Sequence, residues 1–423
     1  MKDADQTSNE RKRYGKDIIW SLIGHFVYLF SLWLVTVLTT NIFDSAGAGI
    51  LGICLVAGNI CGSIANFNLR LIYASDVNNR HKDSTYFTLR VCLSLVTFIA
   101  AFAYSISLQY TFDIVGAIMI FFIYKSSEFV SDILYGTMQR YKKLYVGGIL
   151  MSIKGVVSFV FYAASSLMFN NLFISLLAMS LSVWVITLIE FVYCKKALGL
   201  KLLSKNGEFT SLVTLFLECL PLFVVLLCSN LLPSIPKIFF ERIYSSEEFG
   251  LYNSIATVST LIQTAASSIA LPMLPKISKT YKDGEIKSFK KLSSLTLGFI
   301  VGLGAIAALC VLLFGDWALH ILYQGRVDSL SYTFIFTIIA GTFTATFTVL
   351  TQILSAMSLK KAITIASIAG TLLCLGISYP FCLYQYVNGV SFALMCSIGL
   401  EVVIAFVFII KGLFSDKTGE KKI

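Results

Sequence analysis

Charge is what this sequence has least of: 13% of its 423 residues are Asp, Glu, Lys or Arg, whereas 57% are apolar. Soluble domains carry about 25% charged residues, so soluble domains of this composition would lack the side chains that cover a surface. Intrinsic disorder is excluded as well, because a chain this apolar collapses in water. With a mean hydropathy of +0.81, the sequence indicates a protein embedded in a membrane.

Signals for enzymatic chemistry are also scarce. The sequence has three histidines, too dispersed for a metal motif, and its ten cysteines include no Cys-x-x-Cys pair. It has no phosphate-binding G-x-x-x-x-G-K-[ST] loop, and the connections between its apolar blocks are too short for a soluble catalytic domain. We therefore expect a protein that is not an enzyme and that binds no metal and no organic cofactor.

What the sequence has instead is twelve apolar blocks. A helix needs about 20 mostly apolar residues to cross the hydrocarbon core, and the period-2 alternation of a membrane β-barrel is absent. The blocks lie at residues 18–40, 46–66, 87–110, 113–138, 146–168, 172–194, 211–235, 249–271, 293–314, 330–355, 361–382 and 388–411. The sequence therefore predicts an all-α polytopic membrane protein with twelve transmembrane helices.

Lysine and arginine are distributed unevenly among the connections between these blocks. With the N-terminus in the cytoplasm, 28 of the 33 basic residues lie in the cytoplasmic tails and loops or at the cytoplasmic ends of the spans, three lie outside and two lie deeper within spans. The positive-inside rule therefore predicts cytoplasmic termini. Anionic headgroups of the inner leaflet account for the net charge of +10, so we expect membrane lipid, and no nucleic acid, as the partner of these basic residues.

The two halves of the chain repeat one topology. Six spans, a basic segment and six more spans indicate a duplicated unit with parallel repeats, which usually hold substrate at their interface and work by rocking. Two Gly-x-x-x-Gly pairs, Gly58…Gly62 and Gly298…Gly302, predict close helix packing. We expect a cytoplasmic N-tail, an N-lobe, a cytoplasmic linker, a C-lobe and a cytoplasmic C-tail at residues 1–17, 18–194, 195–210, 211–411 and 412–423.

Ionisable residues inside spans cost about 2.5–3.5 kcal/mol each at mid-membrane and mark candidate functional positions. The fourth span carries five polar residues spaced three or four apart, on one helical stripe: Lys125, Glu128, Asp132, Tyr135 and Gln139. Lys154 in the fifth span lies about 14 Å from its cytoplasmic end, a depth that allows pairing with Asp132 or Glu128. These charges either line a cavity that handles substrate or ions, which we expect, or form a neutralised packing pair.

Four further residues each have two interpretations. Arg70 and Arg90 either anchor the cytoplasmic interface or line the inner mouth of a cavity. His25 in the first span is either a hydrogen-bonded packing residue or a cavity group. Glu401 in the twelfth span is either an ion site or a buried hydrogen-bonded acid. The sequence leaves these alternatives open.

Three stretches carry a resemblance to a known family. They are Leu232–Tyr252, beginning Leu-Pro-Ser-Ile-Pro-Lys, then Leu271–Gly284, beginning Leu-Pro-Met-Leu-Pro-Lys, and the pattern Glu128…Asp132…Gly136…Gln139. With its length and topology, the chain resembles the Wzx-type flippases of polysaccharide repeat units, which serve O-antigen, capsule and exopolysaccharide synthesis. These proteins belong to the multidrug/oligosaccharidyl-lipid/polysaccharide exporter (MOP) superfamily.

The resemblance implies a fold and a function. The fold would be two six-helix lobes arranged as a V around a central cavity. The substrate would be an undecaprenyl-diphosphate-linked oligosaccharide, moved from the inner to the outer leaflet of a bacterial plasma membrane by alternating access. The implied partners are a polysaccharide polymerase and glycosyltransferases, and coupling to Na⁺ or H⁺ is open.

The resemblance also implies roles for residues. A diphosphate needs fixed cations, and Lys125 and Lys154 are the basic residues that lie within the predicted spans away from their cytoplasmic ends. Glu128, Asp132 and Glu401 are the candidates for ion coupling. The sugars need hydroxyl and amide partners, for which the predicted spans offer Tyr135, Gln139, Asn230, Asn253 and Gln263.

Three other functions stay open. A multidrug/toxin cation antiporter of the same fold would have a cavity dominated by acids, which Lys125 and Lys154 disfavour. A lipid II flippase usually has two more helices and more arginine. A polysaccharide polymerase or ligase normally has a long outer loop with catalytic polar residues, and the outer connections here are short.

The uneven distribution of basic residues generates a topology prediction. A cysteine introduced at Asn170 or Asn171, in a predicted outer loop, should react with a membrane-impermeant maleimide added to intact cells. A reporter fused after residue 423 should be active in the cytoplasm. Labelling of the loop cysteine only after the cells are opened would contradict the twelve-helix arrangement.

Overall fold

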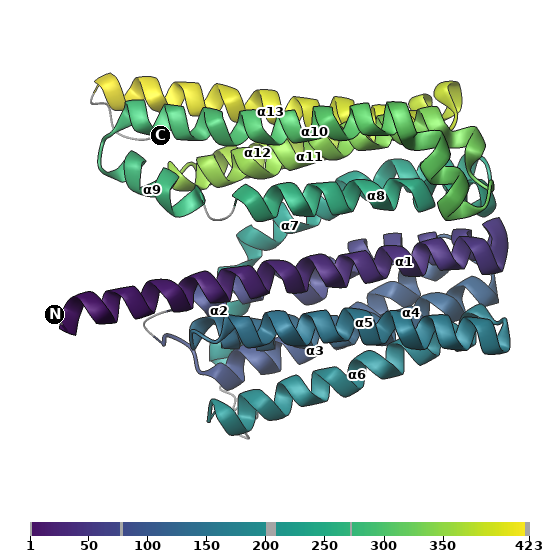
Figure 1. Ribbon diagram of the computed structural model, residues 1–423, viewed down its shortest axis with the longest axis horizontal. Coiled ribbons are helices and arrows are strands. Elements are labelled where there is room, and N and C mark those ends of the chain that lie inside the picture. The colour runs from purple at the N-terminus through teal and green to yellow at the C-terminus, as the bar shows by residue number, and fades with distance from the viewer. Residues whose placement is uncertain (1, 77–78, 200–208, 271–272, 419–423) are drawn as a thin grey trace. The chain divides into compact units, whose positions relative to one another are not determined.

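The computed structural model describes residues 2–76, 79–199, 209–270 and 273–418, and the described residues form helices and no strands (Figure 1). The helices are α1 Lys2–Asn66, α2 Leu69–Ser75, α3 Asp83–Ser107, α4 Phe112–Arg140, α5 Leu144–Phe169, α6 Leu172–Ala197, α7 Phe209–Ile243, α8 Ser246–Ala270, α9 Leu274–Lys282, α10 Ile286–Tyr323, the 3₁₀ turn η2 Asp328–Leu330, α11 Ser331–Ala356, α12 Lys360–Gln385 and α13 Val387–Thr418.

Ten helical segments among the described residues are long and apolar enough to cross a membrane. The first, Ile19–Ser75, contains two predicted spans, because the backbone of α1 breaks at Asp44 with φ 57° and ψ −164°. Helix α8, which is rich in Ser and Thr, is not among the ten. With α8 included and α1 counted as two spans, the described residues contain the twelve long helices of the prediction, and the all-α polytopic fold is confirmed.

Some predicted segments lie partly outside the described residues. Residues 200–208 make up most of the predicted linker 195–210, and residues 419–423 end the predicted C-tail 412–423. The helix α1 begins at Lys2, so the predicted N-tail 1–17 continues without a break into the first span. The assignment of the tails and the linker to the cytoplasm stays a prediction.

The chain divides into two compact units, Met1–Leu227 and Cys228–Ile423, and the boundary falls inside α7. In the N-terminal unit, α1 packs along α5 and also contacts α3 and α4, while α6 packs on α4 and α5 (Figure 1). The first part of α7 belongs to this unit, because Leu215 and Cys219 are fully buried in its core. The Phe67 ring stacks on Phe223 with 4.6 Å between centroids.

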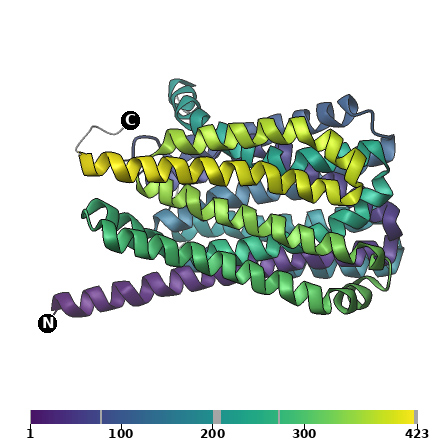
Figure 2. The same ribbon diagram turned by 90° about the horizontal axis from the view of Figure 1, so that it is seen from above.

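The C-terminal unit is organised around α11. This helix contacts α8, α10 and α13, and α12 packs along α13, so the green to yellow helices of Figure 2 run side by side. Its core includes Leu232 of α7, Ile300 of α10, Leu350 of α11 and Ile398 of α13. The last part of α7 therefore packs in this unit.

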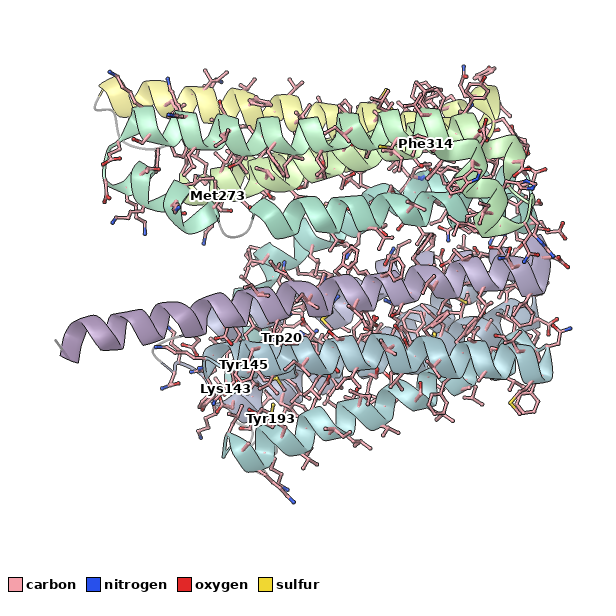
Figure 3. All side chains as sticks on the ribbon, in the orientation of Figure 1. Trp20, Lys143, Tyr145, Tyr193, Met273 and Phe314 are labelled. Carbon is pink, nitrogen blue, oxygen red and sulfur yellow. The ribbon has the colours of Figure 1, made fainter. Side chains whose placement is uncertain are left out.

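Backbone contact between α1 and α5 depends on glycine. A Cβ atom at Gly148 would lie 2.1 Å from the carbonyl oxygen of Trp20, and one at Gly24 would lie 2.2 Å from that of Gly148. Figure 3 labels Trp20 at this crossing. Because real Cβ atoms do not approach other atoms so closely, α1 and α5 pack in this way only where both carry glycine.

The two Gly-x-x-x-Gly pairs of the sequence differ in the structure. A Cβ at Gly58 or Gly62 would lie 3.0 or 3.1 Å from the rings of Phe121 and Phe129, so the first pair does allow close packing of α4 on α1. Among the described residues, a Cβ at Gly298 or Gly302 would meet no atom within 4 Å. The packing role predicted for the second pair is wrong, because no described residue lies close enough to that face of α10 to need glycine.

These glycines provide a matched pair of variants. Gly148→Ala should force α1 and α5 apart, at a cost of about 1–3 kcal/mol typical of overpacking. Gly302→Ala adds the same methyl group to open space and should leave stability unchanged or raise it by up to about 1 kcal/mol through helix propensity. The thermal unfolding midpoint of the purified protein measures both, and equal midpoints for the two variants would contradict the described crossing.

Candidate functional site

The polar residues of α4 divide among three groups of partners. In the first group, the Lys125 Nζ atom lies 2.6 Å from Glu128 Oε2. The hydroxyl of Tyr28, on α1, donates to Glu128 and is also hydrogen-bonded to Tyr124. The side chains of Lys125 and Glu128 are 14% and 20% exposed, so this pair is close to the surface of the unit but held by α1.

The second group is centred on Asp132, which bridges two arginines. Its Oδ2 atom lies 2.6 Å from Nη2 of Arg90, and its Oδ1 atom lies 3.5 Å from Nη1 of Arg70. Arg90 belongs to α3, and its side chain is fully buried. It also donates to the carbonyl oxygen of Ala65 at 2.5 Å. Arg70 is 34% exposed and donates to Gln139 Oε1 at 3.4 Å. Asp132 therefore has one fixed cation and one loosely held cation.

The third group lies between α4, α5 and α6. Lys154 Nζ lies 3.4 Å from Glu190 Oε2 and donates to the hydroxyl oxygens of Thr187, at 2.8 Å, and Ser131. Tyr135 donates to the other oxygen of Glu190 at 2.7 Å. The side chains of Lys154 and Glu190 are 2% and 0% exposed. The sequence predicts that Lys154 pairs with an acid of the fourth span. This partner is wrong, because the carboxylate that Lys154 contacts is that of Glu190 on α6.

The sequence pattern does not single out Glu190, although it is an acid within the predicted span 172–194. It lies four residues before the predicted end of that span, where the carboxylate of an acid can reach water. Its depth in the span therefore does not distinguish a buried Glu190 from one exposed at the membrane surface. Arg90 is deeper than an interfacial anchor, because its guanidinium is enclosed by α3, α4 and the end of the second span.

Part-exposed polar groups gather on α1, α2 and α4 of the N-terminal unit. His25 of α1 is exposed and lies within electrostatic range of Arg70 and Glu128. We call this set the polar face, and its residues are His25, Arg70, Lys125, Glu128, Asp132 and Gln139. Because charges within spanning helices are costly against lipid, the polar face is suited to contact water or a polar ligand.

The polar face taken together with Arg90, which is buried behind it, has a positive balance of charge. The cations Arg70, Arg90 and Lys125 face the two carboxylates Glu128 and Asp132, which leaves one positive charge with His25 neutral. The buried pair of Lys154 with Glu190 adds no net charge. The arrangement therefore favours an anionic ligand over a cationic one.

Other predicted residues belong to the C-terminal unit. Lys237, one of the three basic residues that the sequence places on the outer side, lies within α7 and donates to Asn253 Oδ1 of α8 at 2.8 Å. Glu401 of α13 is 3% exposed and packs on Gly370 of α12, and Gln263 of α8 is part-exposed. The described residues contain no group of three His, Cys, Asp or Glu side chains arranged for a metal ion.

Comparison with known proteins identifies one curated relative and several solved structures. No protein-family model matches the chain. The capsular polysaccharide biosynthesis protein CapF of Staphylococcus aureus is 25% identical over 249 residues, which cover 58% of this chain and 62% of CapF. The match thus spans less than two thirds of that relative.

Two solved structures superpose on nearly the whole chain. An inward-facing MATE family multidrug resistance transporter of the MOP superfamily has a TM-score of 0.71 and 12% identity over 93% of this chain and 95% of its own. The lipid II flippase MurJ, in an inward closed conformation, has a TM-score of 0.71 and 14% identity over 94% of this chain and 89% of its own. At identities below 25%, these two superpositions show that the chain shares the fold of a MATE family transporter and of a lipid II flippase.

The geometry of Lys154 and Glu190 generates a stability prediction. Lys154→Ala leaves a carboxylate buried without its cation, which typically costs about 3–5 kcal/mol, so the amount of folded protein in the membrane should fall. The double variant Lys154→Met with Glu190→Gln removes both charges and should restore that amount. Immunoblotting of membranes measures both effects. Normal abundance of Lys154→Ala would contradict the stabilising role of this buried pair.

Proposed function

Since this chain has the fold of the MOP-superfamily transporters, we propose that it is a flippase for a prenyl-diphosphate-linked oligosaccharide. It moves undecaprenyl-diphosphate-linked repeat units from the inner to the outer leaflet of a bacterial plasma membrane, for the synthesis of a surface polysaccharide. The similarity to CapF, a capsular polysaccharide biosynthesis protein, supports this class of substrate.

The observation that carries the proposal is the positive balance of the polar face together with the buried Arg90. A diphosphate has to be held by cations during its passage, and arginine binds phosphate oxygens through two parallel N–H donors. Arg70 is one third exposed, and its 3.5 Å distance to Asp132 is long for an ion pair. Its guanidinium can therefore exchange Asp132 for a phosphate at little cost, while Arg90 keeps the carboxylate neutralised.

The remaining polar groups have complementary roles in this proposal. Gln139 and His25 offer partners to sugar hydroxyls, and the prenyl tail stays in the lipid. Glu128 and Glu401 are the candidates for coupling to H⁺ or Na⁺, because each is a carboxylate within a spanning helix. A polysaccharide polymerase and glycosyltransferases are the proposed partners that consume and supply the repeat unit.

A second candidate is the transport of lipid II, the substrate named for MurJ, whose TM-score equals that of the multidrug transporter. Lipid II also carries a prenyl diphosphate, so the polar face fits both substrates. Export of organic cations is disfavoured, because the surplus charge of the polar face and Arg90 together repels them.

Arg70→Ala tests the proposal directly. It removes the exposed cation but leaves Asp132 paired with Arg90, so abundance should be normal while transport of a fluorescent lipid-linked oligosaccharide into proteoliposomes falls at least about tenfold, the loss of one charge-assisted contact. Arg80→Ala, an exposed arginine outside the spans, is the matched control and should transport normally.

Asp132→Asn separates the structural role from the binding role. It leaves Arg90 buried without a counter-charge, so abundance should fall, in contrast to Arg70→Ala. Full transport by Arg70→Ala would remove the polar face from substrate binding. Transport of organic cations but of no lipid-linked sugar by the unmodified protein would overturn the proposed function.

A further inference from the structure

Lys237 is a cation of the C-terminal unit that has a neutral partner. It lies six residues before the end of α7, about 9 Å along the helix axis, and its Nζ atom donates to Asn253 Oδ1 at 2.8 Å. No carboxylate forms an ion pair with Lys237 in the part of the chain that the structure describes. The pair therefore carries an uncompensated positive charge.

Asn253 contributes an unused donor beside this charge. Its side chain is 2% exposed, and its Nδ2 atom is buried with no hydrogen-bond acceptor among the described residues. The Oδ1 atom is assigned by the lysine, which can only donate. A buried N–H group without an acceptor is costly, and native proteins avoid it unless a ligand or water supplies the acceptor.

The surroundings favour a charged acceptor. Asn253 is held in place through its backbone, since Thr257 Oγ1 donates to its carbonyl oxygen, and the neighbouring side chains Phe240 and Tyr252 are buried. In such apolar surroundings an ammonium group attracts an anion more strongly than in water. An aspartate at position 253 would have nearly the same shape as asparagine and would also neutralise Lys237. An asparagine that serves packing alone would therefore be a less stable choice than aspartate, whereas an asparagine that leaves the charge of Lys237 available suits an anion site.

We propose that Lys237 and Asn253 form an oxyanion-binding subsite in the C-terminal unit, which takes a phosphate or carboxylate group of the transported lipid-linked oligosaccharide. The inference rests on the proposed function. It adds a second group of residues that binds an anion of the substrate, and none of them belongs to the polar face. The ammonium group of Lys237 supplies the charge, and the Asn253 Nδ2 group supplies a directed hydrogen bond.

Asn253→Asp is the informative variant. It keeps the shape of the side chain but supplies a carboxylate that pairs with Lys237, so the protein should fold with an unchanged or higher thermal midpoint while affinity for an oxyanion falls about tenfold. Lys237→Met, which removes the charge, is the second variant and should lose affinity to a similar extent. Lys361→Gln, an exposed lysine of the same unit, is the control and should bind as the unmodified protein does.

Binding is measured in nanodiscs with three probes: undecaprenyl diphosphate, an undecaprenyl-diphosphate-linked neutral disaccharide, and the same disaccharide with one uronic acid. An equal loss for all three probes in Asn253→Asp and Lys237→Met assigns the subsite to the diphosphate. A loss confined to the uronate probe assigns it to an acidic sugar. Either result supports the subsite.

Two results would overturn the inference, and only the second would also contradict the proposed function. Unchanged affinity of both variants for all three probes, in a protein that binds them, would reduce Lys237 and Asn253 to a packing contact while the proposed function stands. Failure of the unmodified protein to bind any of the three probes would contradict the proposed function and the subsite together. If Asn253→Asp does not fold, the comparison rests on Lys237→Met.

Discussion

A charged side chain within a spanning helix needs an opposite charge or water, and the N-terminal unit meets this need around Asp132. The carboxylate sits between a guanidinium that is fully buried and one that is one third exposed. The same residue thus ties α4 to α3 and α2. Because breaking a buried pair is far more costly than breaking an exposed one, the two arginines differ in what they can do: Arg90 holds the helices together, and Arg70 is available.

The buried pair of Lys154 with Glu190 is the counterpart of this arrangement where α4 contacts α5 and α6. It joins α5 to α6 and draws Tyr135 and Ser131 of α4 into the same network. Residues on one helix thus serve two purposes. Those directed at α5 and α6 are fully enclosed and stabilise the unit, whereas those directed at α1 and α2 keep some exposure and form the polar face.

The sequence was sufficient for the fold but only partly for the site. Long apolar blocks predict spanning helices because the hydrocarbon core sets their length. The backbone break at Asp44 joins the first two spans without a loop, but it does not change the number of spans. A stripe on α4 was also predictable from its spacing. The partners were not, because spacing fixes the direction of a side chain on its own helix but not which neighbouring helix lies there. Tyr135 and Lys154 meet Glu190 because α6 packs on both α4 and α5, and the unused amide of Asn253 has no signature in sequence at all.

The helix α7 gives this architecture a mechanical property. Leu215 and Cys219 at its beginning are packed in one unit, and Leu232 near its end is packed in the other, so the only covalent path from unit to unit runs through a continuous helix. A flexible loop would allow each unit to shift without effect on the other. A helix instead transmits torque, and Pro221, Pro233 and Pro236 weaken its backbone hydrogen bonds on both sides of the boundary. Any rotation of one unit against the other therefore bends or twists α7, and the turns around these prolines are where the helix deforms most easily.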